Sequence, residues 1–227
     1  MAVVDPDALL VERGFRLPYA SQPVGLAMSP AGDAAYATLL AVGKLVKLDL
    51  ASGNVVGEVA VGPWPRGLSL SHDGTEAYVT RFISPDAAGE VVHVNAAELA
   101  VLKTIQLFPD TTTLDSDLQG RGLPNYLFSV AITPDGRSAW VTGKKDNIFR
   151  GTLRDGNSLN QDSTVRPLTC ILDLGAGAEI GPRRIDMNDR SLPAHVTFSP
   201  RGDYAAVTLA GSNMIEVRDT ETGSIQV

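Results

Sequence analysis

The side chains best suited to chemistry gather in the middle of the chain. Six polar residues stand out there: Arg121, Asn125, Lys145, Asp146, Asn147 and Arg150. Their guanidinium, ammonium and amide donors suit carboxylate or phosphate groups, or a partner domain. The alternative is a charged rim with an Asp-Asn turn between two strands. We predict ligand or partner binding at these residues and assign no catalytic residue.

The three histidines, His72, His93 and His195, are too far apart in sequence to suggest a metal cluster. His195 joins the candidate binding residues because it falls in a strand that we expect at the centre of the fold. The alternative is a structural or solvent-facing histidine. Two acidic stretches, 115–117 and 186–189, lack the pattern of a calcium loop, so we interpret them as solvated loops and predict no metal site.

Composition limits the classes of function. Lys and Arg total 19 against 26 Asp and Glu, a net charge of −7 without a basic run, so we predict no nucleic-acid partner. The single cysteine, Cys170, excludes an intramolecular disulfide, and no C-x-x-C-H segment is present to attach haem covalently. We therefore predict no cofactor in this chain. The sequence also lacks a signal-peptide pattern, a membrane-spanning apolar run, and the G-x-S-x-G, P-loop, G-x-G-x-x-G and H-E-x-x-H motifs.

The strongest pattern is a sixteen-residue unit that occurs four times without gaps. The copies are PVGLAMSPAGDAAYAT (23–38), PRGLSLSHDGTEAYVT (65–80), LFSVAITPDGRSAWVT (127–142) and PAHVTFSPRGDYAAVT (193–208). In each copy the tenth residue is glycine and the last is threonine. A β-sandwich also has short strands and frequent turns, but it does not predict four gapless copies.

Each unit has the pattern of a β-hairpin followed by two more strands. Apolar residues two apart, such as Leu68 and Leu70, indicate a strand with one buried face. The Ser/Thr-Pro-Asp-Gly type segment then favours a tight turn, and the aromatic and β-branched residues after it favour the partner strand. Further apolar runs follow at 45–49, 55–61, 90–94, 102–107 and 214–218. Four antiparallel strands per repeat, arranged radially, form the blade of a β-propeller.

The repeat spacing sets the expected organisation. The repeat glycines lie 42, 62 and 66 residues apart, so the first interval matches a bare blade and the later two carry insertions, near 108–121 and 154–163. We expect an all-β fold of about four blades, at 23–62, 63–120, 121–182 and 183–227, after an N-terminal segment, 1–22, that supplies a strand to a preceding or closing blade. We also expect these blades to belong to a larger propeller of seven or eight blades. The open edges of this partial set of blades favour self-association. The alternative is a complete four-bladed propeller.

The repeats resemble the YVTN family of bacterial β-propellers, which is YncE-like and related to WD40 repeats, through PRGLSLSHDGTEAYVT and NMIEVRDTETG. Four segments are more narrowly similar to the propeller found fused to di-haem cytochrome c peroxidase, or MauG-like, modules. They are GRGLPNYL (120–127), KKDNIFRG (144–151), STVRPLTCILDL (163–174) and RRIDMNDRSLPAHVTFSP (183–200). Related propellers hold haem d1 through a histidine, which adds interest to His195.

The resemblance implies a periplasmic or cell-surface location and a fused or separate haem domain as partner, although this chain contains no haem-binding cysteine of its own. We therefore expect a non-catalytic binding or scaffold module. Two alternatives stay open: a lactonase-type hydrolase, because seven-bladed lactonases share the repeat, and a surface-layer interaction protein.

Overall fold

The computed structural model describes residues 1–116, 119–148 and 164–226, and it is all-β, as expected. The predicted strands are present, and each repeat unit forms the first two strands of an antiparallel sheet. The first sheet contains β3 (Pro23–Met28), β4 (Ala34–Leu39), β5 (Lys44–Asp49) and β6 (Val55–Ala60). The second contains β7 (Pro65–Leu70), β8 (Glu76–Arg81), β9 (Gly89–Asn95) and β10 (Ala100–Leu107).

The third sheet is larger, and the fourth is smaller. The third contains β11 (Leu123–Ile132), β12 (Ser138–Asp146), β13 (Val165–Asp173) and β14 (Ala178–Glu179), with β15 (Ile185–Asp186) also paired to β13. The fourth contains β16 (Pro193–Phe198), β17 (Tyr204–Leu209) and β18 (Met214–Asp219). Two short 3₁₀ turns, η1 (Gly181–Arg183) and η2 (Ala210–Ser212), complete the elements.

The repeated turn has the same geometry in all four copies. In the first copy the Gly32 amide donates to the Ser29 carbonyl at 2.9 Å, and Gly32 has φ +71°, which a glycine adopts without strain. The equivalent glycines 74, 136 and 202 also have positive φ. The turn residues therefore act as the sequence predicts, and each makes a hairpin of the first two strands.

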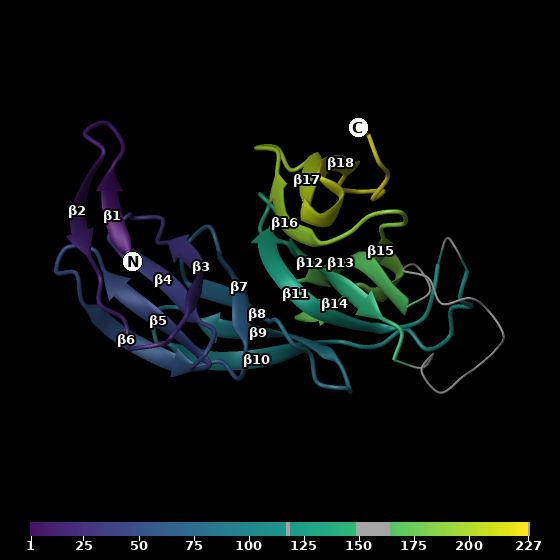
Figure 1. Cartoon of the computed structure of the whole chain (residues 1–227), viewed down its shortest axis with the longest axis horizontal. Coiled ribbons are helices and arrows are strands. Elements are labelled where there is room, and N and C mark those ends of the chain that lie inside the picture. The colour runs from purple at the N-terminus through teal and green to yellow at the C-terminus, as the bar shows by residue number, and fades with distance from the viewer. Residues whose placement is uncertain (117–118, 149–163, 227) are drawn as a thin grey trace.

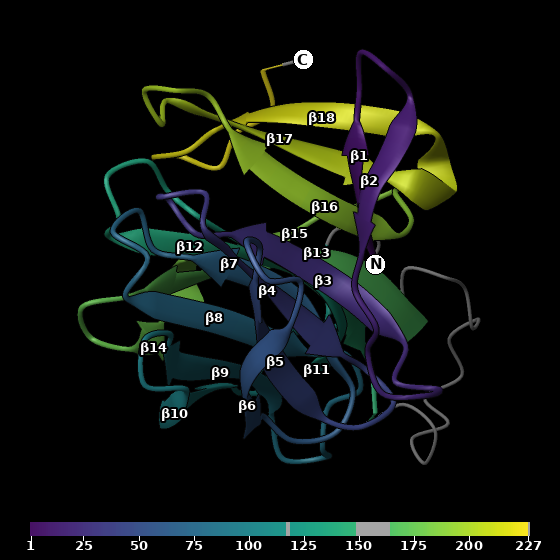
Figure 2. The same ribbon diagram turned by 90° about the vertical axis from the view of Figure 1, so that its left-hand side faces the viewer.

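The sheets are arranged as the blades of a propeller. Figure 1 shows them following one another along an arc, and Figure 2, turned by 90°, shows the sheets of the first two blades toward the viewer. Their first strands contact one another in the order β3, β7, β11 and β16, so these strands lie innermost. The fold class predicted from the repeats is therefore confirmed.

Apolar side chains between neighbouring blades form the core. Alternate residues of β4 face opposite ways: Tyr36 is buried against the second blade, whereas Ala35 and Ala37 are buried on the other side. Further clusters lie between the second and third blades and between the third and fourth. Both faces of an inner blade are thus buried, as stacked blades require.

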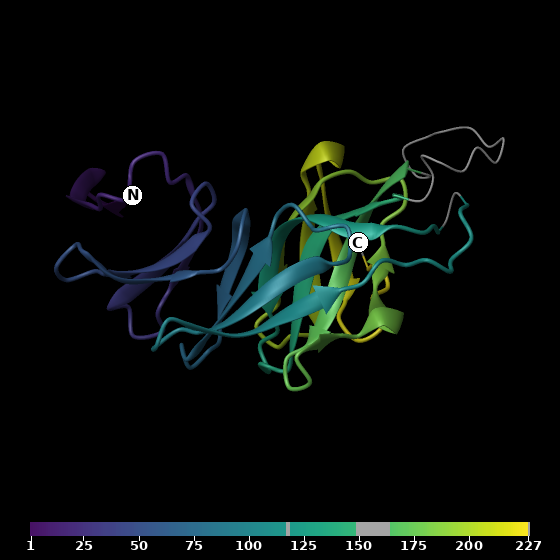
Figure 3. The same ribbon diagram turned by 90° about the horizontal axis from the view of Figure 1, so that it is seen from below.

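The N-terminal segment packs on the free side of the first blade. Its strands β1 (Ala2–Asp5) and β2 (Leu10–Gly14) pair with each other in a separate two-stranded sheet, and Phe15 lies in the core cluster with β4 and β5. Viewed from below in Figure 3, this hairpin and the first blade lie at one end of the molecule, and the last two blades lie at the other.

In the first two blades, the threonine that ends the repeat links neighbouring blades, whereas Thr142 of the third blade bonds to Ser129 of its own blade. Thr80 Oγ1 accepts a hydrogen bond from the Gly67 amide at 2.8 Å and donates to the Leu127 carbonyl of the next blade at 2.9 Å. Thr38 makes the same pair of bonds, and the side chains of Thr38 and Thr80 are fully buried. Thr208, in the fourth blade, is half-exposed because no described blade follows it.

Candidate functional site

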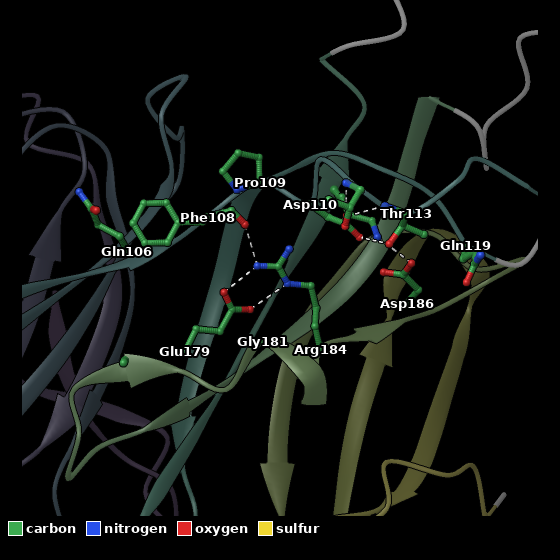
Figure 4. A pocket seen from close by; sticks show the side chains of 13 residues that line it. Gln106, Phe108, Pro109, Asp110, Thr113, Gln119, Glu179, Gly181, Arg184 and Asp186 are labelled. Atoms are coloured by element: carbon green, nitrogen blue, oxygen red, sulfur yellow. Dashed lines mark hydrogen bonds and ion pairs between the residues drawn. The ribbon is translucent and has the colours of Figure 1, made fainter.

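A polar pocket of about 580 Å³ lies between the second and third blades, beyond the end of β10 (Figure 4). The loop after β10 supplies one wall, and the segment from β14 to β15 supplies the other, with the end of β12 between them. The lining residues are Gln106, Phe108, Pro109, Asp110, Thr112, Thr113, Gln119, Lys145, Ala178, Glu179, Gly181, Arg184 and Asp186. The pocket therefore depends on the insertion that lengthens the second repeat.

One end of the pocket is closed by an ion pair of the third blade, whose arginine also bonds to the second blade. Arg184 donates to both carboxylate oxygens of Glu179, at 2.8 and 2.6 Å, and to the Phe108 carbonyl at 2.8 Å. Such two-pronged pairs are stronger than single contacts and fix the orientation of both groups. Figure 4 shows this clamp beside the Phe108 ring and apart from Asp110, Thr113 and Asp186. The arginine thus holds the start of the loop against the third blade.

The other end contains a buried lysine. Lys145 is only 3% exposed, and its ammonium lies 2.7 Å from Asp186 Oδ2. Arg166, equally buried, lies 4.0 Å from the same carboxylate and donates to the Ser116 carbonyl at 2.8 Å. Buried charges are stable only when they are paired in this way. Asp186, which the sequence suggested to be part of a solvated loop, is therefore a structural counter-ion.

Asp115 organises the loop that forms the outer wall. Its carboxylate accepts hydrogen bonds from the Arg121 amide at 2.9 Å, the Arg121 guanidinium at 2.8 Å and the Asn147 side chain at 3.0 Å. Burial acts to raise the pKa of Asp115, but these hydrogen bonds outweigh it and lower the pKa to about 2. Two predicted site residues, Arg121 and Asn147, therefore meet at one carboxylate.

Asn125 and Asp146 hold a bulge in the first strand of the third blade. Asn125 Oδ1 accepts from the Ser84 amide at 2.9 Å and the Tyr126 amide at 2.8 Å, and Nδ2 donates to Asp146 Oδ2 at 2.8 Å. The β11–β12 register shifts between Asn125 and Ser129, and Tyr126 has φ +46°. A bulge re-aims the side chains of a strand. Here it places Tyr126 beside Phe82, with ring centroids 4.6 Å apart.

His195 lies elsewhere, on β16, where it is exposed and lines a separate pocket of about 430 Å³ beside the inner strands. Its place on a first strand agrees with the sequence prediction. It occupies the repeat position filled by Gly25 and Gly67 in the first two blades. A Cβ at Gly25 would lie 2.3 Å from the Arg66 carbonyl, and one at Gly67 would lie 2.7 Å from Ser129 Cα, so the following blade leaves no room for a side chain at these two glycines.

The structure thus gathers five of the seven predicted site residues around the end of β12. Lys145 lines the pocket, Arg121 and Asn147 support its loop, and Asn125 and Asp146 clamp the bulge. The sixth, His195, lies outside this group, and Arg150 lies outside the described residues, as does the insertion near 154–163.

The buried charged groups of the pocket are paired with one another. Its cations already have carboxylate partners, so their main effect is to fix the loop. Within the described part of the chain, no group of three or more His, Cys, Asp or Glu residues is placed to hold a metal ion. Burial raises the pKa of the Cys170 thiol well above its usual value, which leaves it protonated and unreactive.

Among the described residues of the loop after β10, two large apolar side chains stay uncovered. Phe108, at the pocket edge, is 61% exposed, and Leu114 is 80% exposed. Sequence reasoning missed Phe108, Glu179 and Arg184 as pocket residues. The length of the insertion was the signal for the loop, but the Glu179–Arg184 pair had no repeat position to reveal it, because both residues lie outside the sixteen-residue unit.

No helix among the described residues is long and apolar enough to cross a membrane. Neither a protein-family model nor a curated protein sequence matches the chain. Solved structures do match it. The hydrazine synthase of Kuenenia stuttgartiensis has 18% identity and a TM-score of 0.58, over 96% of this chain and 70% of that one.

Two further structures have the same TM-score. The dihydro-heme d1 dehydrogenase NirN is 18% identical, and the match covers 100% of this chain and 40% of NirN. A putative 6-phosphogluconolactonase from Bacteroides uniformis is 16% identical, and the match covers 98% of this chain and 61% of that protein. The chain therefore spans less than two thirds of each of these two neighbours. Likenesses at this level of identity show the fold alone, and that fold is the β-propeller.

Proposed function

We propose that this chain is a non-catalytic binding and scaffold module of an exported or cell-surface protein, and that the loop after β10 contacts its partner. One observation carries the proposal: Phe108 and Leu114 are exposed on a loop that paired charges hold in place. Aromatic side chains such as Phe are enriched at protein interfaces, and a few central anchors carry most of the binding energy when a partner covers them. A loop already fixed before binding loses less conformational entropy on association.

The geometry around Phe108 supports its role as an anchor. Its carbonyl accepts from Arg184, which Glu179 holds in turn, so the backbone beneath the ring is fixed by the third blade. The polar groups around the pocket form a rim of the kind that surrounds the apolar centre of an interface. A partner with an apolar pocket and a polar border fits this surface.

The partner we propose is a haem-bearing domain of the di-haem peroxidase type, fused or separate. The segments similar to peroxidase-associated propellers support this choice. One of them, 183–200, supplies Arg184 and Asp186 to the pocket. The fold likeness to NirN, which is named a dihydro-heme d1 dehydrogenase, is consistent with a propeller that works beside haem. Such a partner would place the chain in the periplasm or at the cell surface.

The test is calorimetric titration of the chain with a purified di-haem peroxidase-type domain. A central anchor contributes about 2 kcal/mol or more, so Phe108→Ala should weaken binding roughly 30-fold. Leu102→Ala, at an equally accessible site on β10 outside the pocket, should leave affinity within about twofold. Equal affinity of the wild type and Phe108→Ala, or no binding of the wild type, would refute the proposed interface.

Lactone hydrolysis is the second candidate function, favoured by the fold likeness to a putative 6-phosphogluconolactonase. Incubation of the chain with a panel of lactones, including a phosphorylated sugar lactone, distinguishes lactone hydrolysis from the non-catalytic function. Ring opening that saturates with substrate and exceeds the buffer rate would overturn the non-catalytic proposal. The surface-layer alternative predicts that purified surface-layer protein specifically binds the chain in a pull-down. If the chain is not recovered with that protein, the surface-layer alternative is excluded.

A further inference from the structure

The pocket beside the inner strands has a charge pattern unlike that of the rest of the protein. Residues two to four of the first three repeats and residues two and three of the fourth line it, so it lies along the innermost strands, at the propeller axis. The second repeat position brings Val24, Arg66, Phe128 and Ala194 together there. None of its eleven lining residues is Asp or Glu, although the whole chain has a net charge of −7. Arg66 supplies the permanent charge.

Arg66 differs from the arginines that stabilise the blades. Arg81, Arg121, Arg184, Arg190 and Arg218 all form ion pairs with carboxylates within 4 Å. Across residues 1–116, 119–148 and 164–226, no carboxylate pairs with the Arg66 guanidinium. Burial alone lowers the pKa of Arg66, with no acidic neighbour to oppose it. This half-buried cation therefore has unused capacity to bind an anion.

Aromatic rings hold the Arg66 guanidinium in position. Its Cζ lies 4.6 Å from the centroid of Phe82 and 4.9 Å from that of Phe128. Contacts to aromatic rings stabilise the cation through their π faces and restrict its rotamers. The five N–H donors of a guanidinium lie in its plane and along its edges, where a planar acceptor can reach them. The site is thus ordered before a ligand arrives.

We propose that the axial pocket binds a small organic carboxylate, with Arg66 donating two parallel hydrogen bonds to the carboxylate group. A carboxylate matches the planar fork of arginine, and the apolar side chains of Leu26, Leu68 and Val130 suit a hydrocarbon body. The volume of about 430 Å³ lies within the usual range of ligand pockets. His195, on the facing strand, adds a second donor. This site is separate from the loop after β10 and does not depend on the proposed partner.

The experiment is a titration of the full chain with benzoate, monitored by calorimetry and by NMR at constant ionic strength maintained with chloride. Inorganic phosphate and the neutral analogue benzyl alcohol are titrated separately. The expected result is saturable benzoate binding, at least tenfold weaker binding of phosphate, and no saturable binding of benzyl alcohol. Phosphate as the tighter ligand would overturn the carboxylate assignment, and equal binding of benzyl alcohol would overturn the role of charge.

Two substitutions locate the site. Arg66→Met keeps an extended apolar side chain and should weaken benzoate binding at least tenfold, with Arg66→Lys intermediate. The matched control is Arg137→Met, on an exposed turn, which should bind benzoate as the wild type does. If Arg66→Met melts cooperatively at the wild-type temperature and still binds benzoate equally, the proposal is wrong. If Arg66→Met does not fold, the test uses the single variants Arg66→Lys and His195→Ala. Benzoate binding that is undiminished in both variants then refutes the proposal.

Discussion

Replacing Thr80 by valine tests whether the last residue of the repeat joins the blades. Valine has nearly the same shape, but it can neither accept from the Gly67 amide nor donate to the Leu127 carbonyl. Thr80 is fully buried, so both backbone groups lose their partner where water cannot replace it. Each unpaired group costs about 1–3 kcal/mol, and the added methyl group offsets about 0.8 kcal/mol of the total. We expect a net loss of about 2–4 kcal/mol in the free energy of unfolding.

The assay is thermal and urea unfolding of Thr80→Val beside Thr208→Val. For a chain of this size 1 kcal/mol corresponds to roughly 2–4 °C in Tm, so Thr80→Val should melt roughly 5–15 °C below the wild type. Thr208 is half-exposed and lies 3.4 Å from the His195 carbonyl, a long contact that water can replace. Its substitution should cost about 0.5 kcal/mol or less. Equal losses at the two sites would refute the inter-blade role of the threonine.

Two further predictions concern the thiol and the acidic loop. Cys170 is fully buried with a raised pKa, so it should not react with Ellman's reagent in the native chain and should react within minutes in urea; rapid native modification would contradict its placement. The Asp115 carboxyl should titrate by NMR with a midpoint near pH 2, because its hydrogen bonds favour the ionised form. The Asp115→Asn variant should lack this titration signal. The stability that the Asp115 carboxyl contributes should be complete above about pH 4 and should be lost as pH falls to about 2, whereas a midpoint near 4 would contradict those bonds.

Local features of the fold were predictable because they repeat. The turn around Gly32 needs positive φ, and a two-residue period such as that of Leu68 and Leu70 is visible in any one copy. Comparison of the four copies then indicates stacked blades. The threonine at the end of each unit was visible as a pattern, but its function was not. Thr80 joins Gly67 of its own blade to Leu127 of the next blade. The sequence of one repeat does not reveal a contact between two blades.

The candidate site was only partly predictable. The polar cluster was found by residue type, yet Asn125 holds a bulge and Arg121 is occupied by Asp115, because hydrogen-bond partners depend on distances across the fold. Phe108 is distant in sequence from Glu179 and Arg184, and it meets them only where two blades face each other. Nothing in their spacing predicts that contact.

By itself, the sequence determined the blade, since turn residues, strand period and repeat length act over a few residues. The tertiary structure decided which charges are neutralised and which stay available. Lys145 lies deep between Asp186 and the blade core, whereas Arg66 has aromatic rings around it and pairs with no carboxylate of the described residues. Both are ordinary cations in the sequence. Their difference arises because the energy of a charge depends on the distance and burial of its partners, which only the assembled blades define.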